Sequence, residues 1–93
     1  MKLPINYEQA SSYTRKKARE QYVIEQKGLC YYCGEPLSEQ PADHIRDLPV
    51  TGALYPPNFF EWPIHLHHDH NTGMTKGAVH CHCNAVLFEY DGE

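Results

Sequence analysis

Two dense groups of side chains in this sequence could bind metals or transfer protons. The first combines Cys30 and Cys33 with the run His80-Cys81-His82-Cys83, and the second is the run His67-His68-Asp69-His70. Zinc in proteins is held mainly by thiolate sulfur and imidazole nitrogen, and imidazole also exchanges protons readily near neutral pH. The sequence therefore offers one group suited to a structural metal and one suited to acid–base or metal-assisted chemistry.

Spacing selects the side chains of the first group that can share one ion. Cys30 and Cys33 flank a tight turn, and His80 and Cys83 are likewise separated by two residues, so each pair can reach a tetrahedral zinc ion. Cys81 with Cys83 is the alternative second pair. Four protein ligands close the coordination sphere, so such a zinc ion is expected to be structural. Two disulfides are the competing explanation for the four cysteines.

The short length of the chain favours a stabilising metal site or disulfides. Its 93 residues are enough for one domain, residues 1–93, whose buried apolar core is thin at this size. We expect a small α+β fold with an N-terminal helix over residues 7–27, ended by Gly28, and a zinc knuckle over residues 28–40. Residues 41–63 are expected to form a loop insertion, and residues 64–90 a hairpin followed by a short helix.

The second group lies in the predicted hairpin. Residues 64–68 alternate apolar and His side chains, as in a strand, and Asn71-Thr72-Gly73 is a turn signal. Residues 75–80 can return as the second strand. A helix is expected over residues 84–90. The loop insertion carries prolines together with Tyr55, Phe59, Phe60 and Trp62, which predicts a packed loop with little regular structure.

Within a strand, neighbouring side chains point in opposite directions. His67 can therefore hold a metal while His68 turns toward a water on the other side of the group that reacts. A second zinc site is the alternative interpretation of this histidine cluster.

The charge pattern allows a local basic face on an acidic chain. The formal net charge is -4, which argues against a protein that coats nucleic acid by electrostatics alone. Arg15, Lys16, Lys17 and Arg19 nevertheless lie within five residues, either as a basic face or as an ordinary solvated helix surface. The N-terminus lacks the apolar run of a signal core or a membrane span, so we expect a reducing, cytoplasmic setting without a membrane.

Two segments resemble a known family. The string from His68 to Asn84, H-D-H-N-T-G-M-T-K-G-A-V-H-C-H-C-N, is similar to the D-H-x-H-x-T-G-x-V-R-G-L-L-C-x-x-C-N signature of the recombination endonuclease VII family of HNH nucleases. Residues 26–34, Q-K-G-L-C-Y-Y-C-G, resemble the Q-x-G-x-C-x-x-C-G that precedes that signature. The resemblance implies a ββα-metal (His-Me finger) fold and a metal-dependent DNA endonuclease that leaves 5′-phosphate and 3′-hydroxyl ends.

Residue roles follow from this resemblance position by position. His68 matches the general base, and Asn84 matches the metal-binding Asn that follows the last zinc ligand. His67 stands where the family has a metal-binding Asp, and His70 matches a second His, for which we expect a hydrogen bond to a phosphate oxygen. The catalytic ion is expected to be Mg²⁺ or Mn²⁺, with Co²⁺ or Ni²⁺ as further candidates because imidazole suits softer ions.

Two further positions depart conservatively from the family pattern. His80 replaces a Cys and is still a residue type that binds zinc. Lys76 replaces an Arg and keeps the positive charge, but it cannot form the bidentate hydrogen bonds that Arg makes with phosphate. Under this reading the partner is DNA, cut by a monomer or a homodimer. Such a short chain would suit a phage protein acting in the host cytoplasm.

Asp43-His44-Ile45 is a rival motif, because D-H-I supplies the metal and base pair in many other HNH proteins. Asn84 lies 16 residues after His68, about one hairpin, but 40 residues after His44, which favours His68. Arg46 is then free to touch a nucleic acid backbone from the loop insertion. The rival for the whole function is a non-catalytic zinc-bearing module that binds DNA or protein.

Overall fold

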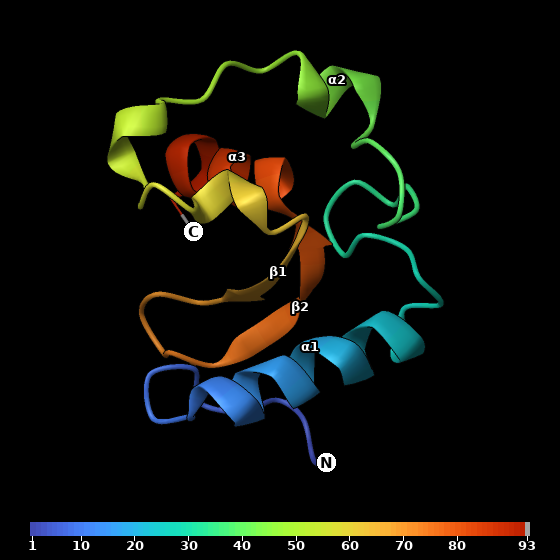
Figure 1. Cartoon of the computed structure of the whole chain (residues 1–93), viewed down its shortest axis with the longest axis vertical. Helices are drawn as coiled ribbons and strands as arrows, with labels where there is room; N and C mark the ends of the chain where they lie inside the picture. The colour runs from blue at the N-terminus through green and yellow to red at the C-terminus, as the bar shows by residue number, and fades with distance from the viewer. Residues whose placement is uncertain (93) are drawn as a thin grey trace.

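The computed structural model describes residues 1–92 and shows a small α+β protein, as predicted (Figure 1). A hairpin of two antiparallel strands lies between α1 on one side and α3 on the other. The elements in chain order are α1 (Ser12–Glu25), α2 (Asp43–Arg46), the 3₁₀ turns η1 (Gly52–Leu54) and η2 (Phe59–Glu61), β1 (Ile64–His68), β2 (Thr75–His80) and α3 (Cys81–Asp91). Over residues 1–92, no helix combines the length and the apolar character that a membrane crossing requires.

Helix α1 begins five residues later than the sequence predicted. Residues 5–7 lie against the hairpin instead: the Tyr7 amide donates to the Gly73 carbonyl at 2.8 Å, and Ile5 exchanges hydrogen bonds with Thr75. Ser11 then caps the helix, because its hydroxyl accepts a hydrogen bond from the amide of Thr14 at 3.1 Å. The end of the helix lies close to the predicted one, and Gly28 follows in a left-handed conformation with φ 76°.

The hairpin has the strands that the sequence predicted, over residues 64–68 and 75–80. Asp69 shapes the turn, since its Oδ1 accepts hydrogen bonds from the amides of Asn71 at 2.7 Å and Thr72 at 3.0 Å. Gly73 completes the turn with φ 77°. The register slips between His67 and His68, which face Gly77 and Thr75 respectively, so the hairpin contains a bulge at this point.

Strand β2 joins α1 and the cysteine turn to the core. The Gln26 side chain accepts from the Ala78 amide at 2.8 Å and donates to the Ala78 carbonyl at 2.9 Å, while the Tyr31 amide donates to the same carbonyl. A Cβ atom on Gly77 would lie 2.8 Å from both the Gln26 Oε1 and the Tyr31 Cβ. On its other side the strand contributes to the core, which consists of Cys30, Leu37, Ile45, Ala78, Val79, Cys83, Val86 and Leu87.

The loop insertion is packed, as predicted, but contains α2 and both 3₁₀ turns. Two residues of α3 hold it in place. The Glu89 carboxylate accepts hydrogen bonds from the Thr51 amide at 3.0 Å and the Tyr55 hydroxyl at 2.8 Å, and the Tyr90 hydroxyl donates to the Pro49 carbonyl at 2.6 Å. Helix α3 itself begins at Cys81, three residues before the predicted start.

Candidate functional site

The first metal-binding group is assembled at the junction of three elements. Cys30 and Cys33 come from the turn after α1, His80 ends β2, and Cys83 lies in the first turn of α3. Their potential ligand atoms all lie within 4.8 Å of one another. The His80 Nδ1 lies 3.4 Å from the Cys33 sulfur and 3.5 Å from the Cys83 sulfur, close to the separation of about 3.6 Å expected between N and S ligands of a tetrahedral zinc ion. The group could therefore hold a metal such as zinc.

Surrounding hydrogen bonds orient this group. The His80 Nε2–H donates to the Pro36 carbonyl at 2.9 Å, which leaves Nδ1 free to face the sulfur atoms. The Cys83 thiol donates to the Cys30 sulfur and lowers the pKa of Cys30 to about 4, and the same contact raises the pKa of Cys83. Thiolate is the form of cysteine that binds metals, so an ion in this group would displace the proton of Cys83.

The neighbouring residues Cys81 and His82 face away from this group, which decides between the two second pairs that the spacing allowed, His80 with Cys83 and Cys81 with Cys83. Cys81 lies outside the group, and the His82 Nε2 donates toward the Ile45 carbonyl at 3.0 Å. All four cysteines are free, so the structure contains no disulfide among them. The geometry thus brings together His80 and Cys83, the H-x-x-C pair.

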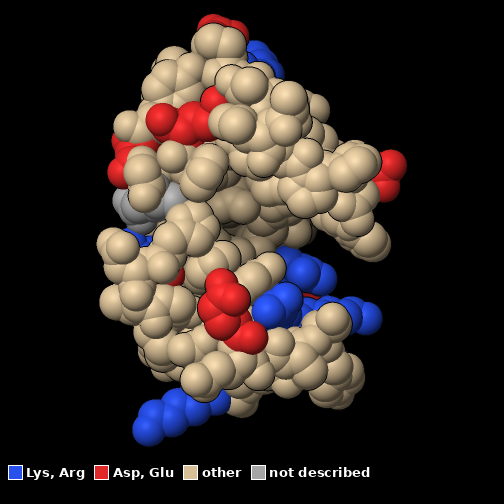
Figure 2. All heavy atoms as spheres, turned by 90° about the vertical axis from the view of Figure 1, so that its left-hand side faces the viewer, with Lys and Arg blue, Asp and Glu red and all other residues tan. Residues whose placement is uncertain are grey.

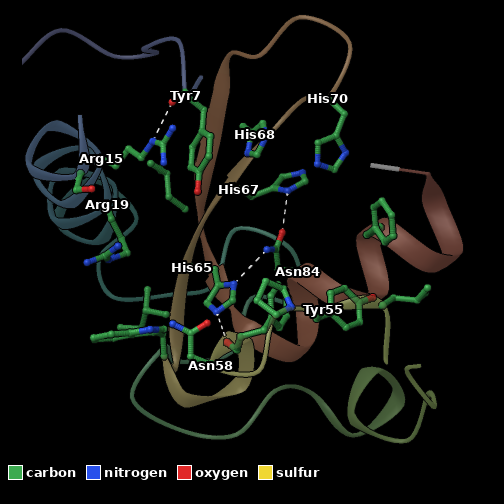
Figure 3. A pocket seen from close by; sticks show the side chains of 18 residues that line it. Tyr7, Arg15, Arg19, Tyr55, Asn58, His65, His67, His68, His70 and Asn84 are labelled. Carbon is green, nitrogen blue, oxygen red and sulfur yellow. Dashed lines mark hydrogen bonds between the residues drawn. The ribbon is translucent and has the colours of Figure 1, made fainter. Parts of the chain in front are cut away.

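The histidines of the hairpin line a second site, a pocket of about 580 Å³ between α1, β1, α3 and the loop insertion (Figure 3). His67 and His68 both line it, but their contacts differ: His68 stacks on Tyr7 beside α1, whereas His67 meets Asn84 of α3. A bulge, which the sequence did not predict, separates these two residues. His70 and Asn84 line the same pocket, so all four residues expected to be catalytic meet in one place.

Asn84 is held with its oxygen toward His67. The His65 Nε2–H donates to the Phe59 carbonyl at 2.8 Å, so the His65 Nδ1 accepts a hydrogen bond, and Asn84 Nδ2 donates to it at 3.1 Å. The His67 Nδ1–H then donates to the Asn84 Oδ1 at 3.2 Å (Figure 3). His65, Asn84 and His67 thus form one chain of hydrogen bonds.

His65 is a site residue that the sequence analysis missed. Burial lowers its pKa, which favours the neutral ring that this hydrogen-bond chain requires. The available signal was its position two residues before His67, since alternate residues of a strand share a face. Its partner Phe59, however, comes from the loop insertion, whose fold could not be read from the sequence.

His68 is held by stacking. Its ring lies on the Tyr7 ring with centroids 4.0 Å apart and an angle of 6°, and the Arg15 guanidinium lies 4.0 Å from the centroid of the Tyr7 ring. His70 meets the His68 ring edge-on at 4.8 Å. Burial, together with the neighbouring histidines, lowers the pKa of His68. At neutral pH its imidazole is therefore in the form that accepts a proton.

The basic run of α1 divides between two faces. Arg15 and Arg19 line the pocket, whereas Lys16 and Lys17 do not, and the Lys17 ammonium lies 3.5 Å from the Glu20 carboxylate. The face of the molecule drawn in Figure 2 is hollowed, and Lys and Arg side chains gather at the lower edge of the hollow. The arginines supply positive charge on the α1 side of the pocket.

Other charged candidates serve the local structure. Asp69 holds the hairpin turn, its pKa is lowered by the amides of Thr72 and Asn71, and its carboxylate lies 3.8 Å from the Lys76 ammonium. Asp43 and Arg46 form an ion pair within α2. Neither Asp43 nor His44 lines the pocket that holds His67, His68 and Asn84.

Comparisons of this chain with protein-family models, with curated proteins and with solved structures found no match.

Proposed function

We propose that this protein is a metal-dependent DNA endonuclease of the HNH type, in which the hairpin and α3 form the ββα-metal motif. The observation that carries the proposal is the convergence of three side chains. His67 and His68 at the end of β1 and Asn84 on α3 line one pocket, and Asn84 presents its amide oxygen to the His67 ring at 3.2 Å. This arrangement combines two metal ligands with a neighbouring base.

His68 is the general base in this proposal. Its imidazole takes the proton from the water that attacks the phosphodiester, and stacking on Tyr7 fixes the plane of the ring. His70, which is exposed beside it, donates a hydrogen bond to a phosphate oxygen. A divalent ion bound by His67 and Asn84 would stabilise negative charge on the phosphate and on the leaving oxygen.

The Cys30, Cys33, His80 and Cys83 group supports this site structurally. Zinc is the ion that best suits three thiolates and one imidazole in a closed tetrahedral set. His80 and Cys83 flank the junction between β2 and α3, and Asn84 follows directly. A zinc ion there would fix the angle at which α3 presents Asn84 to His67.

The proposal is tested by relaxation of supercoiled plasmid DNA in Mg²⁺, in Mn²⁺ and in EDTA. We expect nicked or linear product with a divalent ion and none in EDTA. His68→Ala should reduce the cleavage rate by about a hundredfold or more, which is the usual contribution of a general base to the rate. The matched control His44→Ala should keep most of the activity. Loss of activity in His44→Ala alone would place the site at Asp43 and His44.

A binding module without catalysis would give a different pattern. Plasmid would stay supercoiled with every ion, while the same samples retarded DNA in a gel. That result would overturn the nuclease proposal and leave the metal-binding group as the main functional feature.

A further inference from the structure

The pocket has an aromatic wall, formed by Tyr55, Phe59 and Trp62 of the loop insertion. Tyr55 and Phe59 stack with centroids 4.4 Å apart, and the Tyr55 hydroxyl is fixed by Glu89 at 2.8 Å, so the wall is braced against α3. Trp62 stands at its end with 61% of its surface exposed. The ring of Trp62 is therefore open to solvent beside the pocket.

A basic wall, formed by Arg15 and Arg19 of α1, lines the same pocket, and Figure 3 shows both arginines on the side opposite Tyr55. Within residues 1–92 neither guanidinium forms an ion pair with a carboxylate. The Arg15 Nε instead donates to the Tyr7 carbonyl at 2.9 Å, which holds it beside the stacked His68 ring. The basic wall is therefore available to a phosphate next to the one that reacts.

Aromatic faces opposite arginines match the two chemical parts of a nucleotide. Bases stack on aromatic rings whatever their sequence, and phosphates bind to arginine. In a continuous duplex both faces of each base are covered by the neighbouring bases, so only an unpaired or unstacked base can use the aromatic wall. The pocket volume of about 580 Å³ is in the range of small-ligand sites, enough for one nucleotide.

We propose that the pocket binds an unpaired nucleotide, its base against the aromatic wall and its phosphate toward the basic wall. The substrate class is then nucleic acid with single-stranded character, such as a flap, a loop or a free strand, in preference to uninterrupted duplex. As a statement about cleavage this inference rests on the proposed nuclease function, whereas the binding itself does not require catalysis.

The chain contains a single tryptophan, so its fluorescence reports on the aromatic wall directly. The test titrates the zinc-loaded His68→Ala protein, which does not consume the probe, with a short single-stranded DNA and with a blunt duplex of the same sequence. We expect the single strand to quench Trp62 and to bind about tenfold more tightly than the duplex, in keeping with the contribution of one stacked base. Equal affinity and equal quenching by both probes would overturn the inference.

Substitutions in the pocket test where the single strand binds. Fluorescence anisotropy measures the affinity of each variant for a labelled single-stranded DNA. Trp62→Ala should weaken binding about tenfold and Trp62→Phe much less, while Tyr13→Ala, an equally exposed ring outside the pocket, should have no effect. Arg19→Ala should weaken binding and reduce its salt dependence, whereas Lys16→Ala, on the same helix but outside the pocket, should change it less. Equal effects of each variant and its control would overturn the assignment.

Failure of this inference is distinguishable from failure of the proposed function. Cleavage of plasmid without any preference for single-stranded probes would retain the nuclease and discard the nucleotide pocket. Quenching and tight single-strand binding, with no cleavage by the wild-type chain in any ion, would retain the pocket and discard the nuclease. Binding of neither probe, with the Trp62 fluorescence unchanged, would discard the pocket even if cleavage were found.

Discussion

At the scale of single residues, the choice of ligand at position 67 determines the character of the proposed catalytic ion. His67 is almost fully buried, and its Nδ1 faces the Asn84 oxygen, so the site offers one nitrogen and one oxygen. Magnesium prefers oxygen ligands and gives up its waters reluctantly, whereas manganese, cobalt and nickel accept imidazole nitrogen readily. A carboxylate at this position would add both a negative charge and a second hard ligand.

We therefore predict that the wild-type protein cuts DNA faster with Mn²⁺, Co²⁺ or Ni²⁺ than with Mg²⁺, and that His67→Asp shifts the preference toward Mg²⁺. Initial cleavage rates at saturating concentrations of each ion measure the effect. If the substitution leaves the order of ions unchanged, His67 is not a ligand and the site must be reassigned.

A second prediction concerns His65, which acts through Asn84. Without the His65 ring, the Asn84 amide loses the acceptor for its Nδ2 group and can turn its oxygen away from His67. Loss of such an orienting contact typically weakens metal binding by about 10–100-fold. His65→Ala should thus raise the metal concentration needed for half-maximal cleavage by that factor, and excess metal should restore much of the rate. A lower rate with an unchanged metal requirement would show that His65 matters only for packing.

The sequence could predict the residues of this site but not their mutual arrangement. The family resemblance pointed to His67, His68, His70 and Asn84, and a hairpin followed by a helix brings such positions to one pocket whatever the loops do. The sequence did not predict the bulge between His67 and His68, since a register slip leaves no mark in a single sequence. His65 was missed because its orienting partner is a carbonyl of the loop insertion.

At the scale of elements, β2 is the strand on which α1 and the cysteine turn depend. Gly77 permits this contact, because any Cβ there would lie 2.8 Å from Gln26 and from Tyr31. We predict that Gly77→Ala lowers the free energy of unfolding by about 1–3 kcal/mol, the usual cost of overpacking. Gly52→Ala is the matched control, since nothing lies within 4 Å of a Cβ at that position. Urea unfolding of both variants measures the difference, and equal stabilities would show that α1 shifts without cost.

The elements themselves were predictable where local patterns were strong. Both strands matched, because alternation and a turn signal specify a hairpin locally. The start of α1 was placed at residue 7 because nothing in residues 7–11 forbids a helix. Tertiary hydrogen bonds to Gly73 and Thr75 instead hold residues 5–7 against the hairpin, and residues 7–9 form a turn. The loop insertion is held by contacts with Glu89 and Tyr90 of α3, which lie 34 to 41 residues away in sequence and leave no periodic signal.

At the scale of the whole molecule, the cysteine–histidine group joins parts that would otherwise be weakly connected. It links the turn after α1, the end of β2 and the start of α3, and Cys30 and Cys83 also belong to the hydrophobic core. The other buried residues of that core are Leu37, Ile45, Ala78, Val79, Val86 and Leu87, a small set for a chain of this length. A metal at this junction would connect the core, the hairpin and Asn84 in one unit.

The last prediction is that the chain binds one zinc ion and unfolds when the ion is removed. Zinc can contribute on the order of 10 kcal/mol at neutral pH to a small domain, comparable to the whole stability of such a fold. Chelation should abolish the helical circular dichroism signal, and added zinc should restore it. Cys83→Ser should unfold or lose zinc, whereas Cys81→Ser, a neighbouring thiol outside the group, should keep one zinc ion per chain by elemental analysis. A folded wild-type protein without zinc, or equal zinc loss in both variants, would contradict the assignment of this group.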